Sequence, residues 1–369
     1  MVTGIGRWWT RCVRISEANN VCKGMTKLYV LFRSVRAYDW WDYKIAGILA
    51  VAYATSMLSD TPLYQVAPDF IFLLVALAIG AVYVSVINDI TDIQEDLAIG
   101  KRNHMARISP KYRWLIPTLC LAVGGFFSYV LWPDKLSLVL YLSAWVVFSL
   151  YSIPPFRFKN RGVLGVLADA CGAHLFPTLF VVSRISFVTD QPIAMVWFIS
   201  VGIWAFTFGL RGILWHQFID KANDLQTNTT TLASKVDVRQ FRPVAAAIMT
   251  IEMAAFLVML IYISEPVLFL LFPVYFVLVG IRFKKYNQLP ISIIAPQDRP
   301  WQMMMLDFYQ CFLPMGLLVS AACVQPWAWV VLVIHMTLFH KIIFIMMRDF
   351  ATVFRWGCSK FVLAIKSMI

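Results

Sequence analysis

Long apolar stretches dominate this chain and limit what it can fold into. Ten of them follow one another, each close to the roughly 20 residues that an α-helix needs to cross a bilayer. Their expected bounds are 44–60, 69–95, 113–132, 136–151, 164–183, 193–219, 242–263, 266–282, 303–323 and 327–347. Charged residues make up only 14% of the 369 residues, against about 25% in soluble domains. The sequence therefore predicts an all-α integral membrane protein.

Lysine and arginine are distributed unevenly between the connections of these stretches. The connections 61–68, 264–265 and 324–326 contain neither residue, whereas alternate connections and both ends of the chain are basic. Cytoplasmic loops of membrane proteins are enriched in lysine and arginine, so we expect ten helices with both termini in the cytoplasm. No polar linker divides the chain, which predicts an interfacial arm at 1–43, one membrane domain at 44–347 and a basic tail at 348–369.

The net charge of +12 could also suit a nucleic-acid-binding protein. The sequence has no RNA-binding signature, glycine-rich phosphate loop or zinc-ligand spacing, so we expect the lipid bilayer and no nucleic acid as a partner. The seven cysteines include no C-x-x-C pair, which favours free thiols. The N-terminus lacks the short apolar core and cleavage site of a signal peptide.

Acidic residues gather at the cytoplasmic end of the second stretch. Asn88, Asp92 and Asp96 are spaced by four residues, and on a continuous helix they would share one face, while Glu95 would point elsewhere. Oxygen ligands of this kind suit Mg²⁺, and Asp89 lies beside them. A solvated helix end is the competing interpretation.

The sixth stretch ends in a matching pattern. His216, Asp220 and Asp224 have the same spacing and also lie at the cytoplasmic side. Two facing acidic clusters suit a pair of Mg²⁺ ions that bind one diphosphate group and act as Lewis acids on it. The alternative is helix capping and ordinary surface charge, although ionisable residues in membrane segments usually have a function.

A basic turn lies between the two acidic segments in the chain. It follows Pro154 and Pro155 and contains Arg157, Lys159 and Arg161 on the same cytoplasmic side. Such cations could bind diphosphate oxygens, or they could be ordinary positive-inside residues. Arg211, within the sixth stretch, is expected near the opposite helix face from Asp220 and could pair with another helix.

These motifs together resemble the UbiA superfamily of intramembrane prenyltransferases. The resemblance is carried by Asn88-Asp89-x-x-Asp92-x-x-x-Asp96, by Tyr151-Ser-x-Pro-Pro-x-Arg-x-Lys159, and by Asp220-x-x-x-Asp224 with the threonines that follow it. It implies a bundle of nine helices around a lipid-accessible cavity, and the apolar stretch 327–347 predicts a tenth helix at the C-terminus in addition to these nine. Members bind a prenyl diphosphate through Mg²⁺, ionise its allylic C–O bond and transfer the carbocation to an acceptor.

The resemblance also assigns roles by motif position. Asp92, Asp96, Asp220 and Asp224 would be the catalytic metal ligands, with Asn88 as a further ligand and Asp89 in support. The spacing adds His216 as a supporting residue. The residues expected to bind the diphosphate are Lys159, Arg157, Lys221, Lys101 and Arg36. Lys101 belongs to the segment 100–107, which stands where the family has a Lys-Pro-x-Arg-Pro type run.

Three functions fit these observations. The first is transfer of a prenyl group to an unidentified acceptor, and the second is cyclisation of the prenyl chain without an acceptor. The third is a transporter or lipid-binding protein. The acidic residues cluster at one membrane face, whereas transporter sites usually lie near the midplane, so the enzymatic functions are favoured.

Overall fold

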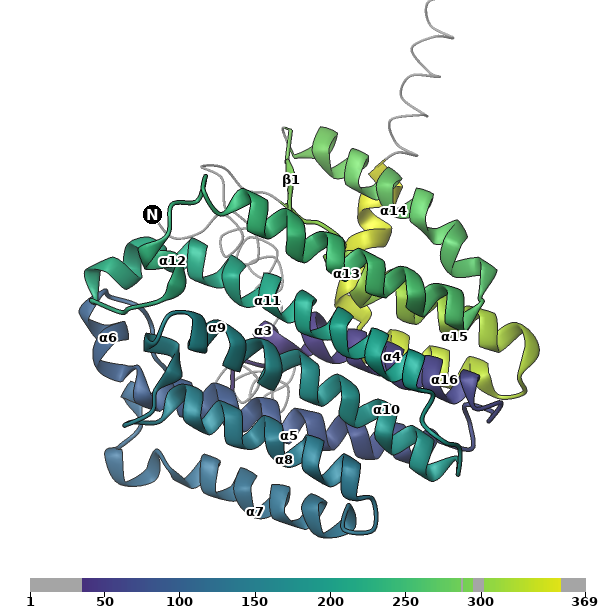
Figure 1. The fold of residues 1–369 in the computed structure, drawn as a ribbon, viewed down its shortest axis with the longest axis horizontal. Helices are drawn as coiled ribbons and strands as arrows, with labels where there is room; N and C mark the ends of the chain where they lie inside the picture. Colours follow the sequence, from purple (N-terminus) through teal and green to yellow (C-terminus); the bar gives the residue numbers. More distant parts are fainter. Residues whose placement is uncertain (1–34, 287, 295–301, 353–369) are drawn as a thin grey trace, which may run out of the picture.

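The computed structural model describes residues 35–286, 288–294 and 302–352 (Figure 1). Most of the expected N-terminal arm and residues 353–369 of the expected tail lie outside the described residues. The longer helices are α4 (Ala46–Leu58), α5 (Ala67–Thr91), α7 (Leu115–Val130), α8 (Lys135–Ser152), α9 (Val163–Ala170), α10 (Phe176–Val188), α11 (Met195–Gln226), α13 (Arg242–Ile263), α14 (Pro266–Lys285), α15 (Leu313–Val324) and α16 (Ala328–Leu338). Shorter elements are the helices α3 (Ala37–Trp40), α6 (Ile93–Ala98) and α12 (Leu232–Lys235), with two-residue parallel strands β1 (Ile291–Ser292) and β2 (Gln302–Met303).

The predicted all-α membrane fold is confirmed. In the described part of the chain, seven helical segments are long and apolar enough to cross a membrane, or eight if a bent pair counts as one. The bent pair covers the expected tenth span, 327–347. It consists of Ala328–Leu338 and His340–Thr352, and the chain turns by 85° between them. The turn lies at Phe339, which has a non-helical backbone and packs its ring on Trp41 with centroids 5.7 Å apart.

Three of the spans contain a wider, π-helical turn. These turns are Trp41–Ile45 before α4, Cys171–Leu175 between α9 and α10, and Phe308–Phe312 before α15. A π-turn inserts one extra residue into a helix and is often found at functional sites. Two of the three turns face the cavity described below.

The long helix α11 lies along α13 and also packs on α9 (Figure 1). Its Arg211 is fully buried and binds Glu252 of α13 through two hydrogen bonds of 2.7 Å. The expectation that Arg211 pairs with another helix is therefore confirmed. Arg211 also donates to the carbonyl oxygen of Met304 at 3.0 Å, so this side chain ties the segment before α15 to the bundle.

A second ionic cluster fastens the C-terminal part of the described chain. Arg282 and Lys285 of α14 both bind Asp349, at 2.9 and 2.8 Å, and Arg282 also binds Asp307 at 2.5 Å. The described cysteines are all free, as the sequence predicts. They are Cys120, Cys171, Cys311 and Cys323.

Candidate active site

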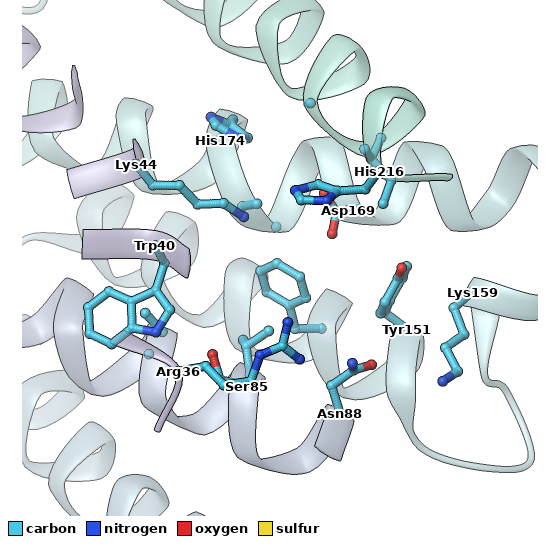
Figure 2. Close-up of a pocket in the computed structure, with 18 of the residues that line it drawn as sticks. Arg36, Trp40, Lys44, Ser85, Asn88, Tyr151, Lys159, Asp169, His174 and His216 are labelled. Atoms are coloured by element: carbon cyan, nitrogen blue, oxygen red, sulfur yellow. The ribbon is translucent and has the colours of Figure 1, made fainter. Parts of the chain in front are cut away.

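A cavity of about 490 Å³ opens among α5, α8, α9, α11 and the segment that leads into α4. One end of it is lined by most of the acidic and basic residues singled out in the sequence. Figure 2 shows the side chains of Asn88, Lys159 and His216 at this cavity. Apolar and aromatic side chains form much of the remaining wall. Among them are Ile48, Leu77, Tyr141, Trp145, Phe148 and Phe180.

The first acidic cluster lies where α5 ends and α6 begins. The helix is interrupted at Asp92, whose backbone (φ −102°, ψ 4°) is not helical. Asn88, Asp92 and Asp96 all line the cavity, as expected, but Glu95 lines it too. The expectation that Glu95 points elsewhere was wrong, because it assumed one continuous helix across the break.

The basic turn closes one side of this cluster. Lys159 is only 7% exposed, lines the cavity and binds Asp92. Arg157 does not line the cavity. It binds Glu95 at 2.8 Å and Asp92 at 3.2 Å. Gly165 of α9 allows this approach, because a Cβ atom there would lie 2.7 Å from the carbonyl oxygen of Phe158.

Asp89 has a different environment from the other acidic residues. Its side chain is buried outside the cavity lining and binds Arg36 at 3.0 Å, whereas Arg36 itself lines the cavity. Asn103 donates hydrogen bonds to the Asp89 carbonyl oxygen at 2.7 Å and to Asp96 Oδ2 at 2.8 Å. Asn103, which was not predicted from the sequence, fixes the orientation of Asp96.

The second acidic cluster faces the first across the cavity. Asp220, Asp224 and His216 line the wall on α11, together with Asn223. Lys101 reaches over from the first cluster and lies 3.4 Å from Asp220. Thr231 Oγ1 donates to Asp224 Oδ2 at 2.9 Å, and the backbone of Thr230 accepts a hydrogen bond from Gly162. The basic turn and the second acidic segment are thus joined directly.

Lys221, which the resemblance placed among the diphosphate-binding residues, points away from the cavity. Its Nζ atom donates to the carbonyl oxygen of Val236 at 2.7 Å, and the residue does not line the cavity. The structure thus gives Lys221 a role in holding the connection after α11. Neighbouring positions on a helix point in directions about 100° apart, so Lys221 and Asp220 cannot share a face.

The donor atoms of the two clusters fit a hard divalent cation. They are oxygen atoms of carboxylates and of Asn88, whose Oδ1 is buried and accepts no hydrogen bond. Within the described residues, no three His, Cys, Asp or Glu side chains come close enough to hold a metal by themselves. Mg²⁺ characteristically takes one or two carboxylates and completes its shell with waters and substrate phosphates, so such a set fits Mg²⁺ together with a phosphate ligand.

The profile of the UbiA prenyltransferase family matches residues 45–290, which contain both acidic clusters and the basic turn. The chain belongs to this family. No curated protein matches it.

Solved structures of a UbiA homolog from Archaeoglobus fulgidus have a similar chain path. The structure bound to GPP and Mg²⁺ has a TM-score of 0.49 and 13% identity, over 82% of this chain and 98% of the other. The structure bound to DMAPP and Mg²⁺ has a TM-score of 0.48 and 12% identity, over 79% and 99%.

Ionisable residues outside the UbiA motifs also line the cavity. Among them are Lys44, Asp169 and His174.

Proposed function

We propose that this protein transfers a prenyl group from a prenyl diphosphate to an acceptor within the membrane, with Mg²⁺ as cofactor and diphosphate as the leaving group. The observation that carries this proposal is the division of one cavity into two parts. Oxygen ligands and cations from distant parts of the chain meet at one end, and an apolar, aromatic wall forms much of the remainder. A prenyl diphosphate has the same division between a polyanionic head and an apolar tail.

The two acidic clusters would hold the cofactor. Asn88, Asp92 and Asp96 would bind one Mg²⁺, and Asp220 with Asp224 would bind another. When bound, Mg²⁺ supplies positive charge that stabilises the developing diphosphate leaving group. In this arrangement Thr231 and Asn103 orient the carboxylates of Asp224 and Asp96, as their hydrogen bonds indicate.

The cations of the site would bind the diphosphate oxygens. Lys159, Lys101 and Arg36 line the cavity and are each paired with a carboxylate. Arg157 would orient the carboxylates of Asp92 and Glu95 rather than bind the substrate, because it binds both and does not line the cavity. Glu95, 3.7 Å from Lys159, would help to position that lysine. Since cytoplasmic loops are rich in Lys and Arg, we place this end of the cavity at the cytoplasmic face.

The apolar part of the cavity would receive the prenyl chain. Tyr141 packs against Trp145 and Phe180 with ring centroids 5.8 and 5.4 Å apart. Aromatic faces stabilise a nearby cation, and exclusion of water protects an allylic cation from hydrolysis. The same aromatic wall favours a second candidate function, cyclisation of the prenyl chain without an acceptor.

The proposal is tested with the purified full-length protein and geranyl or farnesyl diphosphate. With Mg²⁺ and a cell extract as a source of acceptors, we expect diphosphate release and prenylated products in mass spectrometry. Removal of Mg²⁺ by EDTA is expected to stop both. Cyclic hydrocarbons formed from the diphosphate alone would establish the cyclase instead. Absence of diphosphate release under all these conditions would contradict both enzymatic functions.

Separate substitutions of Lys159 and Lys221 test which of the two lysines binds the diphosphate. The structure favours Lys159 alone, whereas the family motif suggested both. Lys159→Met is expected to raise KM for the prenyl diphosphate about tenfold or more, because a charge-assisted contact to a buried phosphate oxygen contributes roughly 1.5–3 kcal/mol. Lys221→Met is expected to leave KM within about twofold. Steady-state kinetics of diphosphate release measure both, and equal effects of the two changes would contradict the assignment.

A further inference from the structure

A second group of ionisable residues lines the cavity next to His216. It consists of Lys44, Asp169 and His174, which we call the inner polar cluster. The three residues come from the turn before α4, from α9, and from the turn between α9 and α10. In Figure 2 the side chains of Lys44 and Asp169 converge on one part of the cavity, with His174 beside Lys44.

Of the inner polar cluster, His174 is only 7% exposed, and Lys44 and Asp169 are partly buried. In the part of the chain that the structure describes, none of its three side chains makes a hydrogen bond or an ion pair. Lys44 is nevertheless close enough for its charge to act on both Asp169 and His174. Unpaired ionisable groups are costly in a membrane segment and commonly mark the path of a substrate. The polar groups of these residues are therefore available to a polar ligand in the cavity.

The backbone around the inner polar cluster is specialised in the same way. Lys44 and His174 each lie on a π-helical turn, and such turns occur frequently at functional sites. Helix α11 approaches His174 through Gly209, where a Cβ atom would lie 3.1 Å from the Cβ atom of His174. Phe208 packs edge-on against the imidazole with centroids 5.1 Å apart. The imidazole is thus held in place at the cavity wall.

The inner polar cluster lies next to the position of the reacting bond. Tyr151 lines the cavity between the acidic clusters and the inner polar cluster. The charges of Asp92, Asp224 and Asp169 all act on its hydroxyl group. A diphosphate bound at Asp92 and Asp224 would therefore place its ester carbon near the inner polar cluster. A carboxylate and an imidazole there would capture a migrating carbocation, and Lys44 would repel it. Such residues suit a second, polar substrate better than an unassisted cyclisation.

We propose that the inner polar cluster binds the acceptor, a small molecule with a nucleophilic hydroxyl group and at least one further oxygen atom. This inference rests on the proposed function. Asp169 accepts the hydroxyl proton, and Lys44 with His174 binds the other oxygen. The acceptor oxygen forms a bond to C1 of the prenyl group. The bond from C1 to the diphosphate oxygen breaks, and its electron pair leaves with the diphosphate.

The test uses the full-length protein in micelles with geranyl diphosphate, Mg²⁺ and one of two probes. Hydroquinone has two hydroxyl groups, whereas 1,4-dimethoxybenzene has the same ring and no hydroxyl proton. We expect a geranyl ether from hydroquinone and none from 1,4-dimethoxybenzene, measured by mass spectrometry. Asp169→Asn is expected to lower ether formation about 100-fold, the usual range for loss of a general base.

The control variants separate this role from folding and from diphosphate binding. Asp190→Asn, in the connection between α10 and α11 outside the cavity lining, is expected to form the ether at the wild-type rate. In Asp169→Asn, thermal stabilisation by geranyl diphosphate with Mg²⁺ is expected to stay at the wild-type value. Lys44→Met is expected to raise KM for hydroquinone about tenfold, as loss of a charged hydrogen bond does.

Three results would overturn the inference alone. They are an unchanged rate in Asp169→Asn, equal use of the two probes, and diphosphate release by the wild type without any ether from hydroquinone. A wild-type protein that is neither stabilised by geranyl diphosphate nor able to release diphosphate would overturn the proposed function as well. The two failures therefore have different signatures.

Discussion

Asp92→Asn is expected to lower kcat/KM for the prenyl diphosphate about 1,000-fold. Asp92 is the residue on which the first acidic cluster and the basic turn meet, since both Lys159 and Arg157 bind it. The change removes the negative charge that would hold Mg²⁺ and keeps the size of the side chain. Loss of one preorganised electrostatic group typically costs about 100- to 1,000-fold in rate, and here the proposed metal ligand and the partner of Lys159 are lost together. The rate of diphosphate release at saturating and limiting substrate measures the effect.

Asp220→Asn provides the companion measurement on the opposite wall. We expect a loss of the same order, because Asp220 belongs to the proposed second set of metal ligands and lies 3.4 Å from Lys101. Asp190→Asn serves as the matched control, with the same chemical change outside the cavity lining. Turnover that survives in either Asp92→Asn or Asp220→Asn would contradict a site built from two acidic clusters.

Arg211→Met is expected to give the largest loss of stability of any single change considered for this chain. Arg211 and Glu252 are both fully buried and joined by two hydrogen bonds of 2.7 Å. Removal of one partner leaves the other charge buried and unpaired, which costs about 3–5 kcal/mol. The free energy of unfolding in micelles, from denaturant titration followed by circular dichroism, measures the loss.

Two further variants show whether the charge itself is responsible. Arg211→Met combined with Glu252→Met is expected to be more stable than Arg211→Met alone, since replacing both charges by apolar groups removes the unpaired charge. Arg184→Met breaks the partly exposed pair with Asp69, whose side chains are 14% and 19% exposed, and should cost only about 1 kcal/mol. A similar loss in Arg184→Met and Arg211→Met would contradict the explanation from burial.

The four-residue spacing of the acidic residues was sufficient to locate both acidic clusters. The same spacing gave a wrong direction for the Glu95 side chain, because it assumes a continuous helix and the helix breaks at Asp92. It could not separate Lys159 from Lys221 either. Lys159 is brought into the cavity by the close approach of α9 at Gly165, whereas the Val236 carbonyl draws Lys221 away.

The inner polar cluster was not predicted from the sequence, although the sequence contains a signal for it. Lys44, Asp169 and His174 are ionisable residues at or within predicted apolar spans, the same signal that Arg211 gives. Asp169 and His174 are five residues apart in one span, which places them on different faces of a regular helix, and Lys44 belongs to another span. Their grouping depends on the packing of α4, α9 and α10 and on two π-helical turns.

The membrane class, the apolar helical segments and the two acidic clusters with the basic turn between them could be predicted from the order of residues alone. These properties are local, because apolar length and the spacing of charges along one helix are set by neighbouring residues. Which of the charged residues face the cavity, and which bind one another outside it, became clear from the folded chain. That choice depends on where helices break and on which backbone atoms lie opposite, and these contacts join residues that are far apart in the chain.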